Sequence, residues 1–299
     1  MATFRGFDLQ GHRGARGLKP ENTLPAFEVA LDCRVTSIET DIHLTRDGVP
    51  VLIHDPQLAD GSMVARLELA RLRSYRFDTN PNPAAFAEQN PSVTPLAQRY
   101  GLEHAIDPYA IPTLHDLFGF VAYYAGEPGQ RVGKSDEQRA KAARLWFDLE
   151  LKRIPSYPEA IGDGYTGDGP ALLEKLIVQA IREAGVAERT TVRSFDHRCV
   201  RFLRQMEPAL TGAILISETA PIDPGELARR ADAQIYGPSL EFLDAEQMRS
   251  TRAAGVRVLP WTANQPEQWQ RLLDLGVDGI TTDYPDRLAA FLQKAGIAF

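Results

Sequence analysis

Short apolar runs alternate with longer amphipathic segments along most of the chain. The apolar runs have the length and composition of buried β-strands, and the segments between them have the period of amphipathic helices. Strands that alternate with helices predict a parallel sheet, because parallel neighbours need a long crossover connection. The predicted strands are Phe7–Gly11, Val35–Leu44, Val49–Ile53, Leu145–Leu151, Thr190–Arg193, Thr211–Ile216, Ala233–Tyr236, Val256–Leu259 and Gly279–Thr281.

Helices are predicted between most of these strands. They are Asn22–Cys33, Val64–Tyr75, Pro112–Tyr124, Ser135–Ala143, Ala171–Ala184, Asp196–Met206, Pro224–Arg230, Asp244–Ala254, Pro266–Leu275 and Pro285–Ala295. The strands outnumber the eight places of a closed (β/α)8 barrel by one. We take Val49–Ile53 as an antiparallel extension of Val35–Leu44, since Asp47-Gly48 favours a tight turn between them. The predicted fold is therefore an α/β fold, a (β/α)8 TIM barrel.

Most of the predicted strands finish at a polar or aromatic residue. These residues are His12, Asp41, Glu150, Ser194, Trp261 and Asp283. In a (β/α)8 barrel, the active-site residues lie at the carboxyl ends of the strands. Because these strand ends span the whole chain, we predict one domain over residues 1–299 rather than two.

One stretch, at about residues 61–111, departs from the alternation. After the helix predicted over Val64–Tyr75, the chain carries several prolines between residues 81 and 95 and shows little periodicity. We interpret the stretch as a Pro-rich insertion after the third strand. It is either a lid that sets substrate choice or a surface excursion, and the sequence favours neither.

The composition is that of an ordinary globular protein, with 43% hydrophobic and 24% charged residues among 299. A net charge of −7 argues against nucleic acid or an anionic membrane as the main partner, so an anionic substrate needs local cations. Neither Cys33 nor Cys199 has a metal-ligand or redox spacing. No run has the ~18 apolar residues of a transmembrane helix, so no stable membrane insertion is expected. The N-terminus lacks a signal-peptide pattern, which predicts a cytoplasmic protein; a periplasmic or secreted chain with its leader removed would look the same.

Two carboxylates, Glu39 and Asp41, lie two residues apart on a predicted strand and therefore point to the same face. Two neighbouring anions are costly to bury unless a cation neutralises them. Glu150 brings a third carboxylate from the end of another strand. Hard oxygen ligands without a cysteine nearby favour one divalent cation, Mg²⁺ or Ca²⁺.

Two histidines, His12 and His54, bracket these carboxylates in the sequence. A reversal centred on Asp47 would place His54 opposite Glu39 or Thr40. We interpret the two histidines as an acid–base pair rather than as metal ligands, because an imidazole titrates near neutral pH and two can divide the roles.

Arg13 and Lys152 add fixed positive charge to this group. A bound cation, two cationic side chains and two imidazoles form a site suited to a phosphodiester. His43 has the same strand parity as Asp41 but nothing requires it, so we expect it to be peripheral. His104, His115 and His197 are expected to be structural or surface residues.

Several motifs together resemble those of a known family. They are GHRGARGLKPENTLPAF, then ETD followed by TRDGVPVLIHD, and later IPTL, FDLELK, SFD, PWTAN and GVDGITTDYP. In this order and spacing they resemble the glycerophosphodiester phosphodiesterases over nearly the whole chain. The combination of HRG, PENT, ExD and HD is the most specific part.

The resemblance implies a (β/α)8 barrel that hydrolyses glycerophosphodiesters, such as glycerophosphocholine or glycerophosphoethanolamine, to glycerol 3-phosphate and an alcohol. By position it implies catalytic roles for His12 and His54, metal binding by Glu39, Asp41 and Glu150, phosphate contacts from Arg13 and Lys152, and a place near the substrate for Trp261.

Three alternatives remain at this point. The same site could cleave lysophospholipids in the manner of a lysophospholipase D, if Phe77, Phe86 and Tyr109 formed an apolar groove. A glycosidase also uses paired carboxylates, but the histidines and cations argue against it. A non-catalytic binding protein would not need this complete set of residues. A small-molecule phosphodiester is the expected partner, and the oligomeric state is left open.

Overall fold

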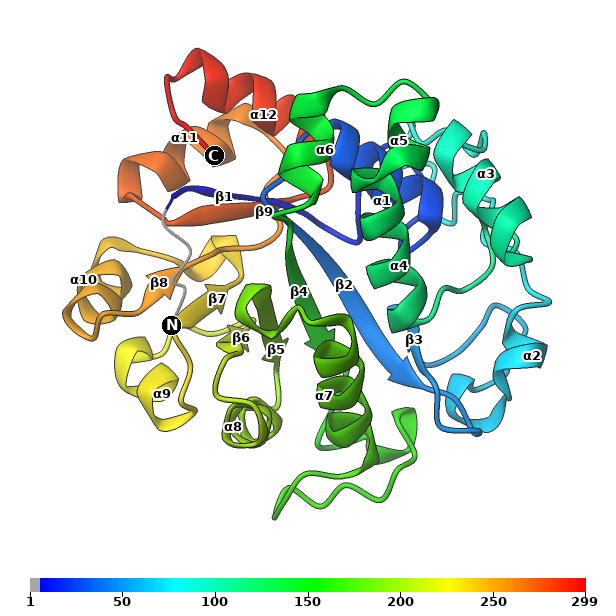
Figure 1. Ribbon diagram of the computed structural model, residues 1–299. Helices are drawn as coiled ribbons and strands as arrows, with labels where there is room; N and C mark the ends of the chain where they lie inside the picture. Colours follow the sequence, from blue (N-terminus) through cyan, green and yellow to red (C-terminus); the bar gives the residue numbers. More distant parts are fainter. Residues whose placement is uncertain (1–5) are drawn as a thin grey trace.

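The computed structural model describes residues 6–299, in which eight parallel strands form a nearly closed ring surrounded by helices (Figure 1). The strands are β1 Asp8–Gly11, β2 Ser37–Leu44, β4 Trp146–Leu151, β5 Thr190–Ser194, β6 Thr211–Ile216, β7 Ile235–Pro238, β8 Arg257–Val258 and β9 Gly279–Thr282. Their order around the ring is β8, β7, β6, β5, β4, β2, β1 and β9. Backbone hydrogen bonds, such as that from Thr281 to the carbonyl of Pro260 (3.1 Å), bridge β9 to the segment after β8. The predicted (β/α)8 TIM barrel is confirmed.

The barrel strands are buried on both faces, as parallel strands under a layer of helices must be. Every residue of β2 is buried. Ile38 and Ile42 belong to the main hydrophobic core together with Phe27 and Leu31 of the first helix. The alternate positions of β2 carry Glu39, Asp41 and His43. One face of the strand therefore packs in the hydrophobic core, and the other presents polar side chains.

A short strand, β3 Pro50–Leu52, pairs antiparallel with the end of β2, as predicted for Val49–Ile53. Its register places Ile42 opposite Leu52, and a further bond joins the Ile53 N–H to the Asp41 carbonyl at 3.0 Å. Continued by two residues, this register sets His54 opposite Thr40. The hairpin therefore brings His54 to the carboxylates of β2.

The helices of the barrel are α1 Leu24–Asp32, α4 Leu114–Ala125, α5 Glu127–Arg131, α6 Asp136–Ala142, α7 Leu172–Ala184, α8 His197–Met206, α9 Pro224–Arg230, α10 Ala245–Ala253, α11 Pro266–Leu275 and α12 Pro285–Lys294. The Thr23 hydroxyl caps α1, and Thr113 and Asp116 form a reciprocal capping box on α4. Within residues 6–299, no helix combines the length and the apolar composition that a membrane span requires.

The prediction of one helix over Val64–Tyr75 was wrong. The structure has a 3-10 turn, η1 Val64–Arg66, and one helical turn, α2 Leu69–Leu72, with Leu67 extended between them. The turn of the β2–β3 hairpin explains the break: the Arg46 N–H bonds the Leu67 carbonyl, and the Asp47 carboxylate accepts the Leu69 N–H. These contacts from a distant segment override the local helical pattern.

Another helix, α3 Pro95–His104, was not predicted. Thr94 caps it with no side-chain hydrogen bond; instead the buried Glu28 carboxylate of α1 accepts the N–H groups of Leu96 and Ala97 at 3.2 and 2.8 Å. Its first turn is thus completed by a residue 68 positions away, which sequence periodicity cannot reveal.

The segment between α2 and α3 lies against the loop that follows β1. The Gln89 amide donates to the Arg16 carbonyl at 2.8 Å, and the Asn90 N–H donates to the Leu18 carbonyl at 2.9 Å. The Lys19 ammonium donates to the Ser92 carbonyl at 2.7 Å. These bonds attach the Pro-rich stretch to the loop that carries His12 and Arg13.

Glu28→Ala should destabilise the protein, because it removes the acceptor for α3 and the fully buried one of the two carboxylates that lie 2.7 Å from the Lys134 ammonium, leaving the partly exposed Asp32. Breaking a buried ion pair from one side typically costs about 3–5 kcal/mol. We expect the free energy of unfolding in urea to fall by about 3 kcal/mol. Glu103→Ala, which removes an exposed α3 glutamate paired with Arg99, is the control and should change it little. Equal losses in the two variants would contradict the capping role.

Candidate active site

Three buried carboxylates meet at the carboxyl ends of two adjacent strands. Glu39 and Asp41 share one face of β2, and Asp41 lies beside Glu150 in the parallel register of β2 and β4. One oxygen of each residue lies within 4.8 Å of the others. The structure thus brings together the three residues for which the sequence predicted metal binding, and this set of oxygens could hold a divalent cation.

The electrostatics of the cluster fit a cation. Burial raises the pKa of Glu39 well above its usual range, and the neighbouring Asp41 and Glu150 raise it further. Burial also opposes ionisation of Asp41, but Arg13 and Lys152 outweigh it and hold that pKa low. A further positive charge among these oxygens would favour the fully ionised cluster.

Two predicted cations reach the cluster from different strands. The Lys152 ammonium lies 2.7 Å from Glu150 Oε1 and 3.4 Å from Asp41 Oδ1. The Arg13 guanidinium lies 3.2 Å from Asp41 Oδ2, and the Arg13 N–H donates to Glu39 Oε2 at 3.0 Å. Arg13 has a φ of 50°, which is strained for a non-glycine residue and places both its backbone and its side chain at the carboxylates.

The PENT segment supports these contacts. Glu21 joins two arginines, with Oε1 2.7 Å from Arg13 and Oε2 2.8 Å from Arg16. The Asn22 amide donates to Asp41 Oδ2 at 3.0 Å and accepts from the Thr40 hydroxyl. Sequence reasoning assigned no catalytic or binding role to the residues of this motif.

A third cation, Arg193, was missed. It lies buried inside the barrel, 3.0 Å from Glu39 Oε1 and 3.3 Å from Asp148 Oδ2, and it donates to Gln10 Oε1 at 3.0 Å. The available signal was an arginine at the end of a predicted barrel strand, because a guanidinium that faces the interior requires anionic partners. Arg193 partly neutralises Glu39 from within the barrel.

His12 is held by a carboxylate that was noted at a strand end but given no function. His12 Nδ1 lies 2.6 Å from Asp283 Oδ1, and the Asn264 amide donates to Asp283 Oδ2 at 2.7 Å. His12 Nε2 lies 3.8 Å from Glu39 Oε2. Burial lowers the pKa of His12, and Asp283 only partly offsets this, so the neutral ring presents Nε2 to the cluster.

His54 is more accessible than His12. Its side chain is 33% exposed, and its Nδ1 lies 2.6 Å from Asp55 Oδ1. The Ile53 N–H donates to the Asp41 carbonyl at 3.0 Å, so the backbone that carries His54 lies beside the cluster. His12 thus faces the carboxylates directly, and the loop that carries His54 lies beside them.

His43 is not peripheral, contrary to expectation. It is 1% exposed, and both ring nitrogens face backbone carbonyls, one of them that of His54. His104 stacks on Tyr100, His115 pairs with Glu183 at the surface, and His197 faces the Leu215 carbonyl.

Trp261 follows β8 and packs edge-on against Phe195, with ring centroids 5.6 Å apart. Its indole N–H donates to the Gly237 carbonyl at 2.9 Å. This bond fixes the ring at the carboxyl end of the barrel and leaves its apolar surface, rather than its N–H, for any ligand.

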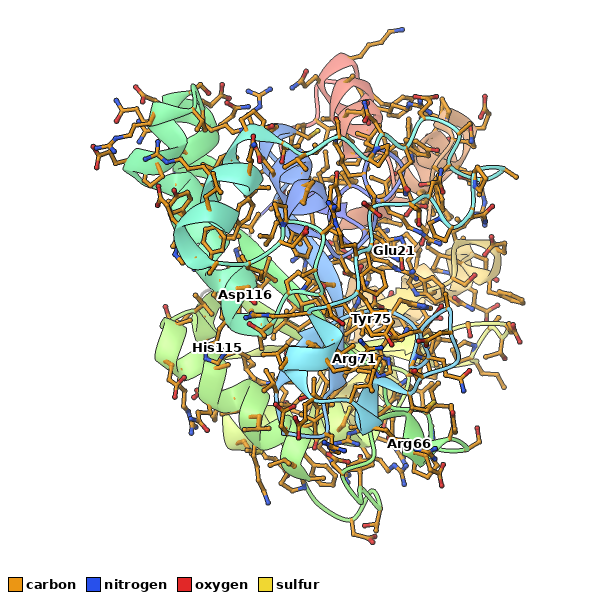
Figure 2. All side chains as sticks on the ribbon, turned by 90° about the vertical axis from the view of Figure 1, so that its right-hand side faces the viewer. Glu21, Arg66, Arg71, Tyr75, His115 and Asp116 are labelled. Carbon is orange, nitrogen blue, oxygen red and sulfur yellow. The ribbon has the colours of Figure 1, made fainter. Side chains whose placement is uncertain are left out.

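A cleft of about 820 Å³ opens beside His54. Its walls come from residues 20–23, 52–60 and 75–77, with residues 79, 81, 110, 111 and 157. Figure 2 shows two of the lining residues, Glu21 and Tyr75, on the same face of the molecule. Part of the stretch predicted as an insertion therefore forms a wall of the cleft that leads to the histidine.

This arrangement can perform phosphoryl chemistry. It combines fixed positive charge, an oxygen-rich cluster that could hold a cation, and two imidazoles on the segments around it. Such a site can bind an anionic group, stabilise charge on its oxygens and move protons on either side of it.

Comparison with known proteins agrees with the geometry. Residues 12–287 match the model of the glycerophosphoryl diester phosphodiesterase family. A glycerophosphodiester phosphodiesterase of Caldanaerobacter subterraneus subsp. tengcongensis is 26% identical over 290 residues, covering 95% of this chain and 97% of the relative. One from Bacillus altitudinis is 27% identical over 289 residues, with the same coverage.

Solved structures share the fold. A protein from Silicibacter pomeroyi DSS-3 superposes with a TM-score of 0.78 and 25% identity, covering 98% of this chain and 95% of that one. An Oleispira antarctica phosphodiesterase in complex with the product sn-glycerol-3-phosphate superposes with a TM-score of 0.67 and 21% identity, covering 95% and 96%. The family match spans nearly the whole chain, so this protein belongs to the glycerophosphoryl diester phosphodiesterase family and is an enzyme of that family.

Proposed function

We propose that the protein hydrolyses small glycerophosphodiesters, such as glycerophosphocholine or glycerophosphoethanolamine, to glycerol 3-phosphate and an alcohol. The observation that carries this proposal is the placement of His12, and of the loop that bears His54, at one carboxylate cluster that also contacts Arg13 and Lys152. The product named in the Oleispira antarctica complex supports the substrate class.

Glu39, Asp41 and Glu150 would hold one divalent cation, Mg²⁺ or Ca²⁺, because their hard oxygens suit these ions and softer ligands are absent from the set. When bound, the cation would supply positive charge to the phosphoryl oxygens. Arg13 and Lys152 would bind the same phosphate group, since each reaches the cluster from its own strand end.

The surroundings of the two histidines support a different role for each. Asp283 accepts the Nδ1 proton of His12, so the lone pair on Nε2 can accept a proton from the attacking hydroxyl. His54 borders the cleft and would protonate the alcohol oxygen that leaves phosphorus. The attacking hydroxyl belongs to water or to the 2-position of the substrate glycerol, which would form a cyclic phosphate that water then opens.

The cleft favours a second candidate, lysophospholipase D-like cleavage. Its volume of about 820 Å³ exceeds what a glycerol or a choline group needs, and Leu52, Ile53, Leu58 and Phe77 give it apolar walls. Leu52, Ile53 and Leu58 are already buried, so an acyl chain would mainly cover the partly exposed Phe77. Phe86 and Tyr109, also considered for such a groove, are buried elsewhere in the insertion.

The metal site can be tested by calorimetric titration with Mg²⁺ and with Ca²⁺ after chelation. Glu150→Gln removes one ligand and should weaken binding of the preferred ion at least about tenfold, or about 1.4 kcal/mol. Asp55→Asn, which removes a nearby charge outside the cluster, should change the affinity much less. Similar affinities for the wild type and Glu150→Gln would contradict the ligand assignment.

The proton-transfer role can be tested by turnover of glycerophosphocholine. His54→Ala should lower kcat about 10²–10⁴-fold, the usual contribution of an acid–base side chain. His115→Ala removes an exposed histidine on α4 and is the matched control, for which we expect the wild-type rate. A folded His54→Ala enzyme with near-normal kcat would rule out this role.

Substrate choice can be tested by comparing kcat/KM for glycerophosphocholine, glycerophosphoethanolamine and lysophosphatidylcholine. Preference for the first two would support the main proposal. A Phe77→Ser variant should then leave that preference unchanged, whereas a selective loss on lysophosphatidylcholine would show that the apolar wall holds an acyl chain.

A further inference from the structure

His43 lies deep in the protein but touches the loop that carries His54. It follows Glu39 and Asp41 on the same face of β2, and its side chain leaves the strand just beyond the carboxylate cluster. Its Nε2 lies 3.1 Å from the His54 carbonyl oxygen, and its Nδ1 lies 3.2 Å from the Ala160 carbonyl oxygen. The ring therefore stands between two loops at the carboxyl end of the barrel.

The backbone around His54 is held by β2 at two points. The Ile53 N–H donates to the Asp41 carbonyl at 3.0 Å, and the His54 carbonyl faces His43. The first bond extends the β2–β3 pairing by one residue, because the last regular pair of that ladder is Ile42 with Leu52. Without the second contact, the His54 carbonyl would lose this partner, and the next backbone bond along the loop would be that from the Val64 N–H to the Pro56 carbonyl at 2.9 Å.

We propose that His43 is a positioning residue for His54, with its Nε2–H donating to the His54 carbonyl. This fixes the peptide from which the His54 ring projects beside the cleft. The inference rests on the proposed role of His54 as the group that protonates the leaving alcohol. It assigns no proton transfer to His43 itself.

The two carbonyls allow a competing structural role. A neutral imidazole carries one N–H, so it donates to only one of the two oxygens. If Nδ1 carried the proton, His43 would instead hold the 3-10 turn η2 Pro158–Ala160 in the loop after β4. Only the Nε2–H form links His43 to the reaction.

Amide side chains separate these two forms. The amide nitrogen of Gln reaches about as far along the side chain as His Nε2, whereas that of Asn reaches as far as His Nδ1. His43→Gln should therefore keep the bond to His54, His43→Asn should keep the bond to Ala160, and His43→Leu should keep neither. Thermal melting and Mg²⁺ titration of each variant would show whether the fold and the nearby Asp41 are preserved.

Turnover should be compared on two probes that share the glycerol phosphate group. Glycerophosphocholine needs a proton on its leaving alkoxide, whereas the p-nitrophenyl diester of glycerol phosphate releases a phenolate that is stable without one. With glycerophosphocholine, kcat should fall about 10–100-fold in His43→Leu and His43→Asn and recover in His43→Gln, with little change in KM. With the p-nitrophenyl diester, all three variants should approach the wild-type kcat.

Each of the other outcomes would overturn either the role of His43 or the proposed function. Equal loss on both probes, or recovery in His43→Asn rather than His43→Gln, would show a structural role and overturn the inference. Wild-type turnover in folded His43→Leu would do the same. Failure of the wild type to hydrolyse either probe would instead overturn the proposed function.

Discussion

The structure depends on one electrostatic constraint, the gathering of Glu39, Asp41 and Glu150 at the carboxyl end of the barrel. One oxygen of each carboxylate lies within 4.8 Å of the others. Ionising all three in a buried site costs free energy unless positive charge lies nearby. The fold therefore surrounds them with Arg13, Lys152 and, inside the barrel, Arg193. Each cation comes from a different strand, so the assembly of the barrel brings these positive charges to the carboxylates.

Strand β2 organises the site because it is longer than its neighbours and extends beyond the ring. Its outward positions pack in the hydrophobic core, and its inward positions carry Glu39, Asp41 and His43 in turn. The same extension pairs with β3 and delivers His54. One strand thus sets the relative positions of two carboxylates and a histidine, and a shift of its register by one residue would turn all of them away.

Much of this could be predicted from the sequence, because the barrel follows from the alternation of strands and helices, and the pairing of Glu39 with Asp41 follows from strand parity. The partners that complete the site could not. Asp283 meets His12 across 271 residues, and only closure of the ring brings them together. The helix α3 and the break after η1 were missed for the same reason, since contacts from α1 and the β2–β3 turn decide them.

The central claim is that Glu39, Asp41 and Glu150 form the binding site of a divalent cation. The most direct test is an anomalous difference map from crystals soaked in Mn²⁺, collected on the wild type and on Glu150→Gln. The account predicts one strong peak in the wild type, coordinated by oxygens of Glu39, Asp41 and Glu150, and a weakened peak in the variant. A peak bound elsewhere, or equal peaks in the two crystals, would contradict it.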